Sequence, residues 1–433
     1  MQLERARRRS RPLNIGRWSG SGIGARDAGA YVLSRKLPSD RPGWRKVGRD
    51  LALWVMDAPF KVVIAGGGVA GLEAALALRD LAGESVETTL LAPDPDFVCR
   101  PMRVLEPFSH PSAPRYPLDR IAADAGAELI TDSFRWLDPA ERVVHTVAGQ
   151  ELRYDALLLA LGARLHPAFS HAVTLDDRVL DEQLHGLIRD LEDAYIRRIA
   201  FVIPSRVGWP LPIYELALMT ARRAYDIGVE VEITIATPED APLALFGERA
   251  SDAVRRLLAQ NGVETVTSAH CAVPRAGRVV IYPRNWTLLV DRIIALPELT
   301  GPSTPGVPKD ARAGLIPVDP YCRVRGLERV FAAGDATDFP VKFGGVAAQQ
   351  ADTAAAGIAA LAGAPVEPHK FLPVVKAVLL GGERPLQLRA HITGGHGSTS
   401  EVADLPGLDP THKIEARYLV PYLESSQRVE ALR

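Results

Sequence analysis

Residues Lys61–Ala75 have the sequence KVVIAGGGVAGLEAA, in which an apolar, β-branched run leads into three glycines and then into an alanine-rich segment. The order of strand, glycine turn and helix is the context in which a GxGxxG pattern binds a dinucleotide. Gly66 permits the tight turn, Gly68 lets a pyrophosphate approach the backbone, and Gly71 lets helix and strand pack closely. The helix N-terminus faces the phosphate charge. The stretch therefore predicts a dinucleotide site with the contacts Gly66, Gly68, Val69, Ala70 and Gly71.

Length and composition set the class of protein. The chain has 433 residues, of which 47% are hydrophobic and 24% charged, as in a folded globular protein of two or three domains. No apolar run approaches the roughly 18 residues of a membrane-spanning helix. Cys99, Cys271 and Cys322 form no CxxC pair, so the sequence predicts neither a zinc cluster nor an adjacent redox dithiol. We expect a cytoplasmic protein without a metal site.

Charge is unevenly distributed along the chain. The first 55 residues hold 13 Lys or Arg against 4 Asp or Glu, although the whole chain has a net charge of −1. Arginine outnumbers lysine 43 to 8, which we attribute to a GC-rich genome, and we expect no nucleic-acid partner. Because Met56 lies just ahead of the first apolar strand, residues 1–55 are interpreted as a basic, disordered extension. A basic arm that touches an anionic surface is the alternative, and whether the extension belongs to the mature protein stays open.

The end of the second predicted strand, Val86–Leu91, is where a ribose-binding acid is expected, about 20 residues beyond the glycines. Ala92 occupies that position and cannot accept a hydrogen bond from a hydroxyl through its side chain. Asp94, two residues further on, is the substitute candidate. A plain turn residue within Pro93–Asp96 is the alternative interpretation, and the predicted fold does not depend on this choice.

Two later segments resemble further signatures of a flavoprotein family. Residues Tyr154–Gly162, YDALLLALG, form an apolar strand that ends in small residues, and Val330–Ala336, VFAAGDA, ends in a Gly-Asp turn. With the glycine turn they resemble the three ordered signatures of the two-dinucleotide-domain flavoproteins, the pyridine nucleotide-disulphide oxidoreductase superfamily, although Leu161 stands where threonine is usual. The resemblance implies FAD as cofactor, with a site that includes Ala160, Gly162, Gly334 and Asp335. It also implies that the Asp335 carboxylate binds the ribityl chain; a helix cap is the alternative.

Within this superfamily the chain resembles sulfide:quinone oxidoreductases and type II NADH dehydrogenases, from Lys61 to about Leu423. Pro93–Phe97 with Arg100 and Pro101 is similar to their loop after the second strand. Val341–Asp352 is similar to the helix whose N-terminus faces the flavin ring, where it would stabilise negative charge. The resemblance implies further cofactor contacts at Arg100, Gly345 and Ala347.

Neither electron donor of these families is supported by the residues. Sulfide oxidation needs thiolates near the flavin, but residues 336–352 contain no cysteine, and a single thiol at Cys99 cannot form an intramolecular pair. Tight NAD(P)H binding needs a second phosphate loop. The turn after Arg198–Ile203 keeps only Gly208 and contains Trp209 and three prolines, which lack N–H donors. Catalytic residues therefore stay unassigned, and NAD(P)H as a second cofactor stays open.

The predicted architecture is an α/β fold with two Rossmann-like domains, the FAD domain being split by insertion of the second. The expected boundaries are 56–165 and 308–362 for the FAD domain, 166–307 for the second domain, and 363–433 for a C-terminal region that covers the flavin. In the related families such a region often rests on the membrane and shapes a quinone pocket. A helically spaced stripe could serve that role, with a buried core stripe as the alternative: Ile414, Tyr418, Leu419 and Tyr422.

The favoured function is an FAD-dependent oxidoreductase that passes two electrons through flavin to a quinone or a similar small-molecule acceptor, from an unidentified small-molecule donor. A soluble NAD(P)H-dependent flavin reductase and a non-catalytic flavoprotein acting as a binding module are the two alternatives. The C-terminal region is the candidate for peripheral contact with the cytoplasmic face of the membrane. The oligomeric state stays open.

Overall fold

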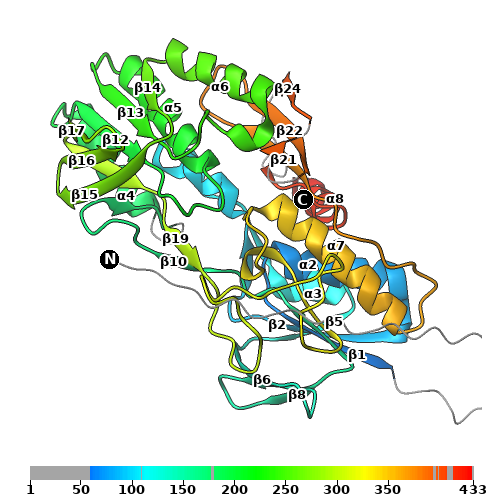
Figure 1. Cartoon of the computed structure of the whole chain (residues 1–433). Helices are drawn as coiled ribbons and strands as arrows, with labels where there is room; N and C mark the ends of the chain where they lie inside the picture. Colours follow the sequence, from blue (N-terminus) through cyan, green and yellow to red (C-terminus); the bar gives the residue numbers. More distant parts are fainter. Residues whose placement is uncertain are drawn as a thin grey trace, which may run out of the picture. The chain divides into compact units, whose positions relative to one another are not determined.

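The structure, a computed structural model, describes residues 59–108, 110–176, 180–393, 396–397, 399–406 and 413–431. The predicted basic extension at 1–55 lies outside these ranges. Two five-stranded parallel sheets organise the described residues (Figure 1). The predicted α/β fold with two Rossmann-like domains is therefore confirmed, whereas the exact domain boundaries stay a prediction.

The first sheet has the strand order β20-β9-β1-β2-β5, and all of its neighbours are parallel. Its strands are β1 (Phe60–Ala65), β2 (Val86–Leu91), β5 (Ala127–Ile130), β9 (Ala156–Leu159) and β20 (Val330–Ala332). The strand β20 joins the edge of this sheet only after the chain has completed the second sheet. The second domain is therefore an insertion into the first.

Each face of the first sheet carries its own core. Val62 and Ile64 pack with helices that cover one face, namely α2 (Val69–Ala82), α3 (Leu118–Asp124), α7 (Gly344–Leu361) and α8 (Leu419–Ala431). The helices α2 and α7 lie side by side on this face (Figure 1). Val63 and Ala65 pack on the other face with the antiparallel strands β6 (Phe134–Asp138), β7 (Val143–Thr146) and β8 (Glu151–Arg153). Because both faces are covered, residues 62–65 of β1 are an unbroken, buried apolar run.

The second sheet repeats this plan. Its order is β11-β18-β12-β13-β14, with the strands β11 (Val173–Thr174), β18 (Arg292–Ala295), β12 (Arg198–Val202), β13 (Glu232–Ala236) and β14 (Val263–Val266). One face packs with α4 (Leu180–Glu192), α5 (Leu211–Asp226) and α6 (Glu248–Gln260). The other face packs with an antiparallel sheet of β15 (His270–Arg275), β16 (Arg278–Tyr282) and β17 (Trp286–Leu289).

Short elements complete the described chain. The strand β3 (Asp96–Val98) pairs with β4 (Arg115–Pro117), and β10 (Arg164–His166) pairs with β19 (Glu298–Thr300) where the chain passes between the sheets. The 3-10 helices are η1 (Gly83–Ser85), η2 (Arg100–Phe108), η3 (Ala244–Phe246) and η4 (Gly334–Ala336). The C-terminal strands are β21 (Val374–Leu379), β22 (Leu386–Thr393), β23 (His396–Gly397) and β24 (Glu401–Asp404).

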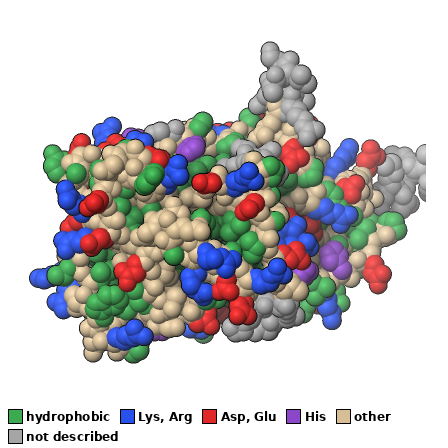
Figure 2. Space-filling model, turned by 90° about the horizontal axis from the view of Figure 1, so that it is seen from above, with side chains coloured by type: hydrophobic (Ala, Val, Ile, Leu, Met, Phe, Trp, Pro, Cys, Tyr) green, Lys and Arg blue, Asp and Glu red, His purple; other side chains and the backbone are tan. Residues whose placement is uncertain are grey.

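The C-terminal region packs on both domains. Val375, Leu379 and Leu388 of its sheet belong to the core of the second domain, whereas Leu419 and Leu423 of α8 belong to the core of the first. Within the described ranges, no helix is both long and apolar enough to cross a membrane. On the face seen in Figure 2, basic and acidic side chains are interspersed.

Candidate functional site

The glycine turn between β1 and α2 contains glycines with two different structural consequences. Gly66 has a φ of +124°, and a Cβ there would overlap the carbonyl oxygen of Ala160. A Cβ on Gly71 would overlap the carbonyl oxygen of Gly66. A Cβ on Gly68, in contrast, would meet no described atom within 4 Å. The backbone therefore needs glycine at the first two positions, while open space lies in front of Gly68.

Three of the predicted contacts meet at one point. A Cβ built on Gly334, whose φ is +78°, lies 3.3 Å from the Cβ of Ala347 and 3.5 Å from that of Ala70. The Gly-Asp turn therefore lies against the N-terminal ends of both α2 and α7. Among the described residues no side chain caps either helix, whose N-cap residues are Gly68 and Phe343. Two helix N-termini with unpaired N–H groups beside an open glycine cradle fit a negatively charged dinucleotide.

The Gly-Asp turn is held by polar side chains that the sequence analysis did not select. The buried Gln350 side chain accepts a hydrogen bond from the Gly334 N–H at 2.8 Å through its Oε1. The Thr337 hydroxyl donates to the Gly334 carbonyl at 2.9 Å, and the Lys342 ammonium donates to the Thr337 carbonyl. Asp335 is thereby presented on a rigid turn and is partly exposed. The sequence signal was the polar group Gln349, Gln350, Asp352 and Thr353 within an alanine-rich helix.

The remaining predicted contacts lie around the same sheet edge. Gly162 has a φ of +67° and open space at its Cβ position, and Ala160 hydrogen-bonds to β1 through its N–H at 2.8 Å from the Ala65 oxygen. Asp94 is exposed in the loop after β2 and forms no hydrogen bond within the described part of the chain. Arg100 is exposed at the first residue of η2.

The corresponding turn of the second domain, between β12 and α5, is filled by side chains. A Cβ on Gly208 would overlap the side chain of Lys342, whose own N–H donates to the Gly208 oxygen at 3.0 Å. The next residue, Trp209, stacks on Phe343 with ring centroids 4.4 Å apart and an interplanar angle of 11°. The one remaining glycine of this turn is therefore used for contact with the loop that precedes α7.

An acidic residue follows β13, where a nucleotide-binding domain carries its ribose-binding acid. The Glu239 carboxylate accepts hydrogen bonds from the Tyr214 hydroxyl at 2.7 Å and the Thr237 hydroxyl at 3.0 Å. Burial raises the pKa of Glu239, and the hydrogen bond from Tyr214 opposes that rise. Because Tyr214 is itself fully buried, this pair is part of the domain core rather than an open binding site.

The segment Lys413–Leu419 runs past the ends of α2 and α7. Carbon atoms of Ile414 lie 3.5 Å from a Cβ built on Gly344, and the Lys413 ammonium forms an almost fully buried ion pair with Glu215 of α5. Ile414 and Leu419 are buried in the core of the first domain. The hydroxyl groups of the other two stripe residues, Tyr418 and Tyr422, donate to Asp80 and Asp124.

Ile414 and Leu419 of the predicted stripe therefore belong to the core of the first domain, whereas Tyr418 and Tyr422 are only partly buried. Contact of this region with a membrane stays a prediction. The helix α8 begins only at Leu419, so Pro421 lies in its first turn, where a proline is tolerated. The segment also covers the N-terminal end of α7, because Ile414 lies against its first residue.

The three cysteines, all within the described residues, form no disulfide. Cys322, in the loop before β20, is 1% exposed. Burial raises the pKa of Cys99 and of Cys271 to about 11 and that of Cys322 well above its usual range. At Cys99 the charge of Lys413 opposes the rise. All three thiols are consequently protonated at neutral pH, which makes them poor nucleophiles.

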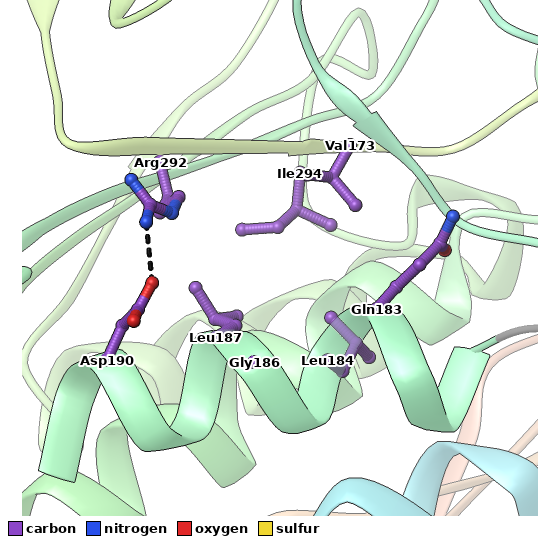
Figure 3. A pocket seen from close by; sticks show the side chains of 8 residues that line it. All are labelled: Val173, Gln183, Leu184, Gly186, Leu187, Asp190, Arg292 and Ile294. Carbon is purple, nitrogen blue, oxygen red and sulfur yellow. Dashed lines mark hydrogen bonds and ion pairs between the residues drawn. The ribbon is translucent and has the colours of Figure 1, made fainter.

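A separate pocket of about 200 Å³ lies on the second domain between α4 and the strands β11 and β18 (Figure 3). Leu184, Leu187 and Ile294 form apolar walls, and the ion pair of Asp190 with Arg292 spans it at one end. None of the predicted cofactor contacts lines this pocket.

Comparison with known proteins connects this geometry to a family. The profile of a family described as pyridine nucleotide-disulphide oxidoreductase matches residues 60–207. An NADH dehydrogenase-like protein of Mycobacterium tuberculosis is 28% identical over 293 residues, which are 64% of this chain and 72% of that protein. A sulfide-quinone reductase of Aquifex aeolicus is 28% identical over 214 residues, which are 46% of this chain and 47% of that protein.

A solved structure has a similar fold. The sulfide:quinone oxidoreductase from Aquifex aeolicus superposes with a TM-score of 0.72 at 19% identity, and the match covers 85% of this chain and 90% of that one. The open glycine turn and the N-terminal end of α2 lie within residues 60–207, which the family profile matches. Over residues 60–207 the chain matches the pyridine nucleotide-disulphide oxidoreductase family, and the comparisons support an FAD-binding, flavin-dependent oxidoreductase.

Proposed function

We propose that the protein passes two electrons through FAD to a quinone or a similar small-molecule acceptor, and that its electron donor is not NAD(P)H. The filled turn of the second domain carries the second half of this proposal. Gly208 is packed against Lys342, and Trp209 stacks on Phe343. A nicotinamide dinucleotide would need backbone N–H groups and space at this turn.

The residues of the first domain suit the parts of FAD as follows. The amides of Gly68, Val69 and Ala70 at the start of α2 would hold the pyrophosphate, and the Asp335 carboxylate would accept a hydrogen bond from a ribityl hydroxyl. The N-terminus of α7, at Gly345 and Ala347, would face the ring and favour negative charge on it. When bound, FAD supplies a ring that accepts and returns two electrons.

The proposed acceptor, a quinone or a similar small molecule, is supported by similarity to a quinone-reducing relative and by the segment that covers the candidate flavin site. One relative is named a sulfide-quinone reductase. The segment Lys413–Leu419 lies at the N-terminal end of α7, where it would form one wall beside a flat acceptor. Sulfide as donor is disfavoured because all three thiols have raised pKa values and form no disulfide. Contact with a membrane surface and the oligomeric state stay predictions.

Anaerobic stopped-flow absorbance of the FAD-loaded protein tests both halves. We expect no rapid bleaching of the flavin by NADH, NADPH or sulfide, and rapid recovery of colour when photoreduced protein is mixed with menadione. Rapid reduction by NADH would overturn the donor proposal and favour the NAD(P)H-dependent alternative, which the name of the mycobacterial relative suggests. Reduced protein that menadione leaves bleached would overturn the acceptor proposal.

Two variants sharpen the donor experiment. Trp209→Ala removes the ring that stacks on Phe343, whereas Trp286→Ala removes a tryptophan that is 41% exposed on the outer sheet of the second domain. If Trp209 blocks a nucleotide, NADH reduces the first variant faster than the wild type and leaves the second unchanged. Equal rates in all three proteins, at a measurable level, would show that the stacked ring excludes nothing.

A further inference from the structure

Two carboxyl groups meet between α2 and α7. Glu73 of α2 is fully buried, and its side chain hydrogen-bonds to that of Asp352 on α7. Asp352 also has one buried carboxyl oxygen without a hydrogen-bond partner among the described residues. Two carboxyl groups can hydrogen-bond to each other only when one of them carries a proton. The pair therefore holds one proton in this arrangement.

Glu73 is the ionised member of the pair. Its Oε1 accepts hydrogen bonds from the N–H groups of Arg417 at 2.6 Å and Tyr418 at 2.9 Å, and its Oε2 accepts one from Leu419 at 2.6 Å. These amides stand at the N-terminus of α8, where a negative charge is stabilising. Burial raises the pKa of both carboxyl groups, but the three N–H groups oppose the rise at Glu73. At Asp352, burial and the charge of Glu73 raise the pKa to about 8.

Other charged groups surround the pair. The Arg417 side chain lowers the pKa of Asp352, in opposition to burial and to Glu73. Asp80 of α2 accepts a hydrogen bond from the Tyr418 hydroxyl at 3.2 Å. Further along the same segment, Glu415 pairs with Lys376 of β21, and Lys413 pairs with Glu215 of α5. Glu73 and Asp352, in contrast, are two carboxyl groups, which repel each other once both are ionised.

The segment that Glu73 caps lies at the candidate flavin site. The Ile414 side chain and the Glu415 carbonyl oxygen each lie 3.5 Å from Cβ positions built on Gly344 and Gly345, the first two residues of α7. Val69, the first residue of α2, lies 3.7 Å from the same Gly344 position. If the segment lost its hydrogen bonds to Glu73, its contacts with the N-terminal ends of α2 and α7 would therefore change as well.

We propose that Glu73 and Asp352 share one proton and that this proton holds the segment Lys413–Leu419 closed over the meeting point of α2 and α7. When the proton leaves, two adjacent negative charges remain in a buried site, and the segment that Glu73 anchors is released. This pH-dependent closure does not depend on the identity of the electron donor or acceptor, because it involves only side chains and amides of this chain.

The sign of the pH dependence follows from linkage. Asp352 binds its proton more tightly in the closed state than in an opened state in which its carboxyl group is solvated. The closed state is therefore favoured at low pH. Its advantage falls by up to about tenfold per pH unit as the pH rises toward 8, and it levels off above that value.

Hydrogen exchange of the full-length, FAD-loaded protein from about pH 6 to about pH 9 tests this proposal. After correction for intrinsic rates, protection of the amides of Arg417–Leu419 should fall by at least about tenfold across this range in the wild type. Asp352→Asn supplies a permanent N–H donor to Glu73, so its protection should not depend on pH. Glu73→Gln removes the anion and should leave the segment weakly protected at every pH.

A matched control separates this effect from general loosening of α8. Asp124→Asn weakens the hydrogen bond from the Tyr422 hydroxyl on the same helix but leaves the carboxyl pair intact. It should lower protection by the same factor at every pH and keep the wild-type pH dependence. Constant protection in the wild type, or the same pH dependence in Asp352→Asn, would overturn the proposal. If Asp352→Asn does not fold, the wild-type series alone decides.

Discussion

The two strand–turn–helix units, β1–α2 and β12–α5, have the same topology but opposite surroundings at their turns. In the first, a Cβ on Gly68 would meet no described atom within 4 Å. In the second, the space beside Gly208 is occupied by the Lys342 side chain, and Trp209 stacks on Phe343. A Rossmann-like unit can thus serve as a ligand cradle or as an interdomain contact, and the turn residues determine which.

At the turn between β12 and α5, packing contacts stabilise the protein and occupy the space that a ligand would need. A stacked aromatic pair is worth about 0.5–1.5 kcal/mol beyond the area it buries, and the hydrogen bond from the Lys342 N–H to the Gly208 oxygen crosses between the domains. Both contacts reach the loop immediately before α7. The second domain therefore supports the helix whose N-terminus faces the candidate flavin site.

The largest expected effect comes from the first turn. Gly68→Val places a side chain in the open cradle, so the purified protein should be colourless and should bind FAD at least a hundredfold more weakly, a loss of about 2.7 kcal/mol. Circular dichroism should show that the fold is retained. Gly71→Val is the contrasting variant, because its side chain would overlap the Gly66 backbone and prevent folding. Full flavin absorbance in purified Gly68→Val would contradict the assignment.

The next effect concerns the partner of this turn, the Gly-Asp turn at η4. A charge-assisted hydrogen bond from a ribityl hydroxyl to Asp335 is worth roughly 1.5–3 kcal/mol. Asp335→Ala should therefore weaken FAD binding by about ten- to a hundredfold, measured by titrating the apoprotein with FAD. Asp338→Ala, at an exposed carboxylate three residues on, is the control and should bind FAD within about threefold of the wild type. Equal affinities for the two variants would remove Asp335 from the site.

In the second turn we expect a loss of stability with little effect on FAD affinity. Gly208→Ala would force the Lys342 side chain to move, at a cost of about 1–3 kcal/mol of unfolding free energy. Gly186→Ala, in α4, places its new Cβ more than 4 Å from every described atom outside the neighbouring helix backbone, and should instead stabilise the protein by about 0.5–1 kcal/mol. Denaturant unfolding measures both. A stable Gly208→Ala variant that lost FAD would show that this glycine serves a ligand.

The smallest effect is expected from the cysteines, which lie in neither turn. Replacing Cys99, Cys271 and Cys322 together by alanine should leave FAD content unchanged and the rate of flavin reduction by the true donor within about twofold, because no thiolate is available at neutral pH. If the triple variant keeps its FAD but loses turnover, the thiols take part in the reaction, and sulfide or another sulfur compound becomes the favoured electron donor.

Local patterns in the sequence were enough to identify the fold and the first turn. Glycine spacing acts through backbone conformation and steric exclusion within a few residues, so Gly66 and Gly71 could be assigned structural roles directly. The prolines and Trp209 likewise indicated a second turn without a phosphate loop. The apolar spacing at Ile414 and Leu419, in contrast, did not indicate what these side chains contact, because helical spacing is the same for a helix on a membrane surface and for one in a protein core.

Only the tertiary structure decided which side chains serve the candidate site from a distance. Glu73 caps the N-terminus of α8, whose anchored amides begin 344 residues further along the chain, and Lys342 fills the space beside Gly208 of the other domain. Asp352 differs from an ordinary helical aspartate only because α7 packs against α2 and buries it beside Glu73. Periodicity and spacing report on neighbours in sequence, whereas charge pairing and burial depend on neighbours in space, which folding alone brings together.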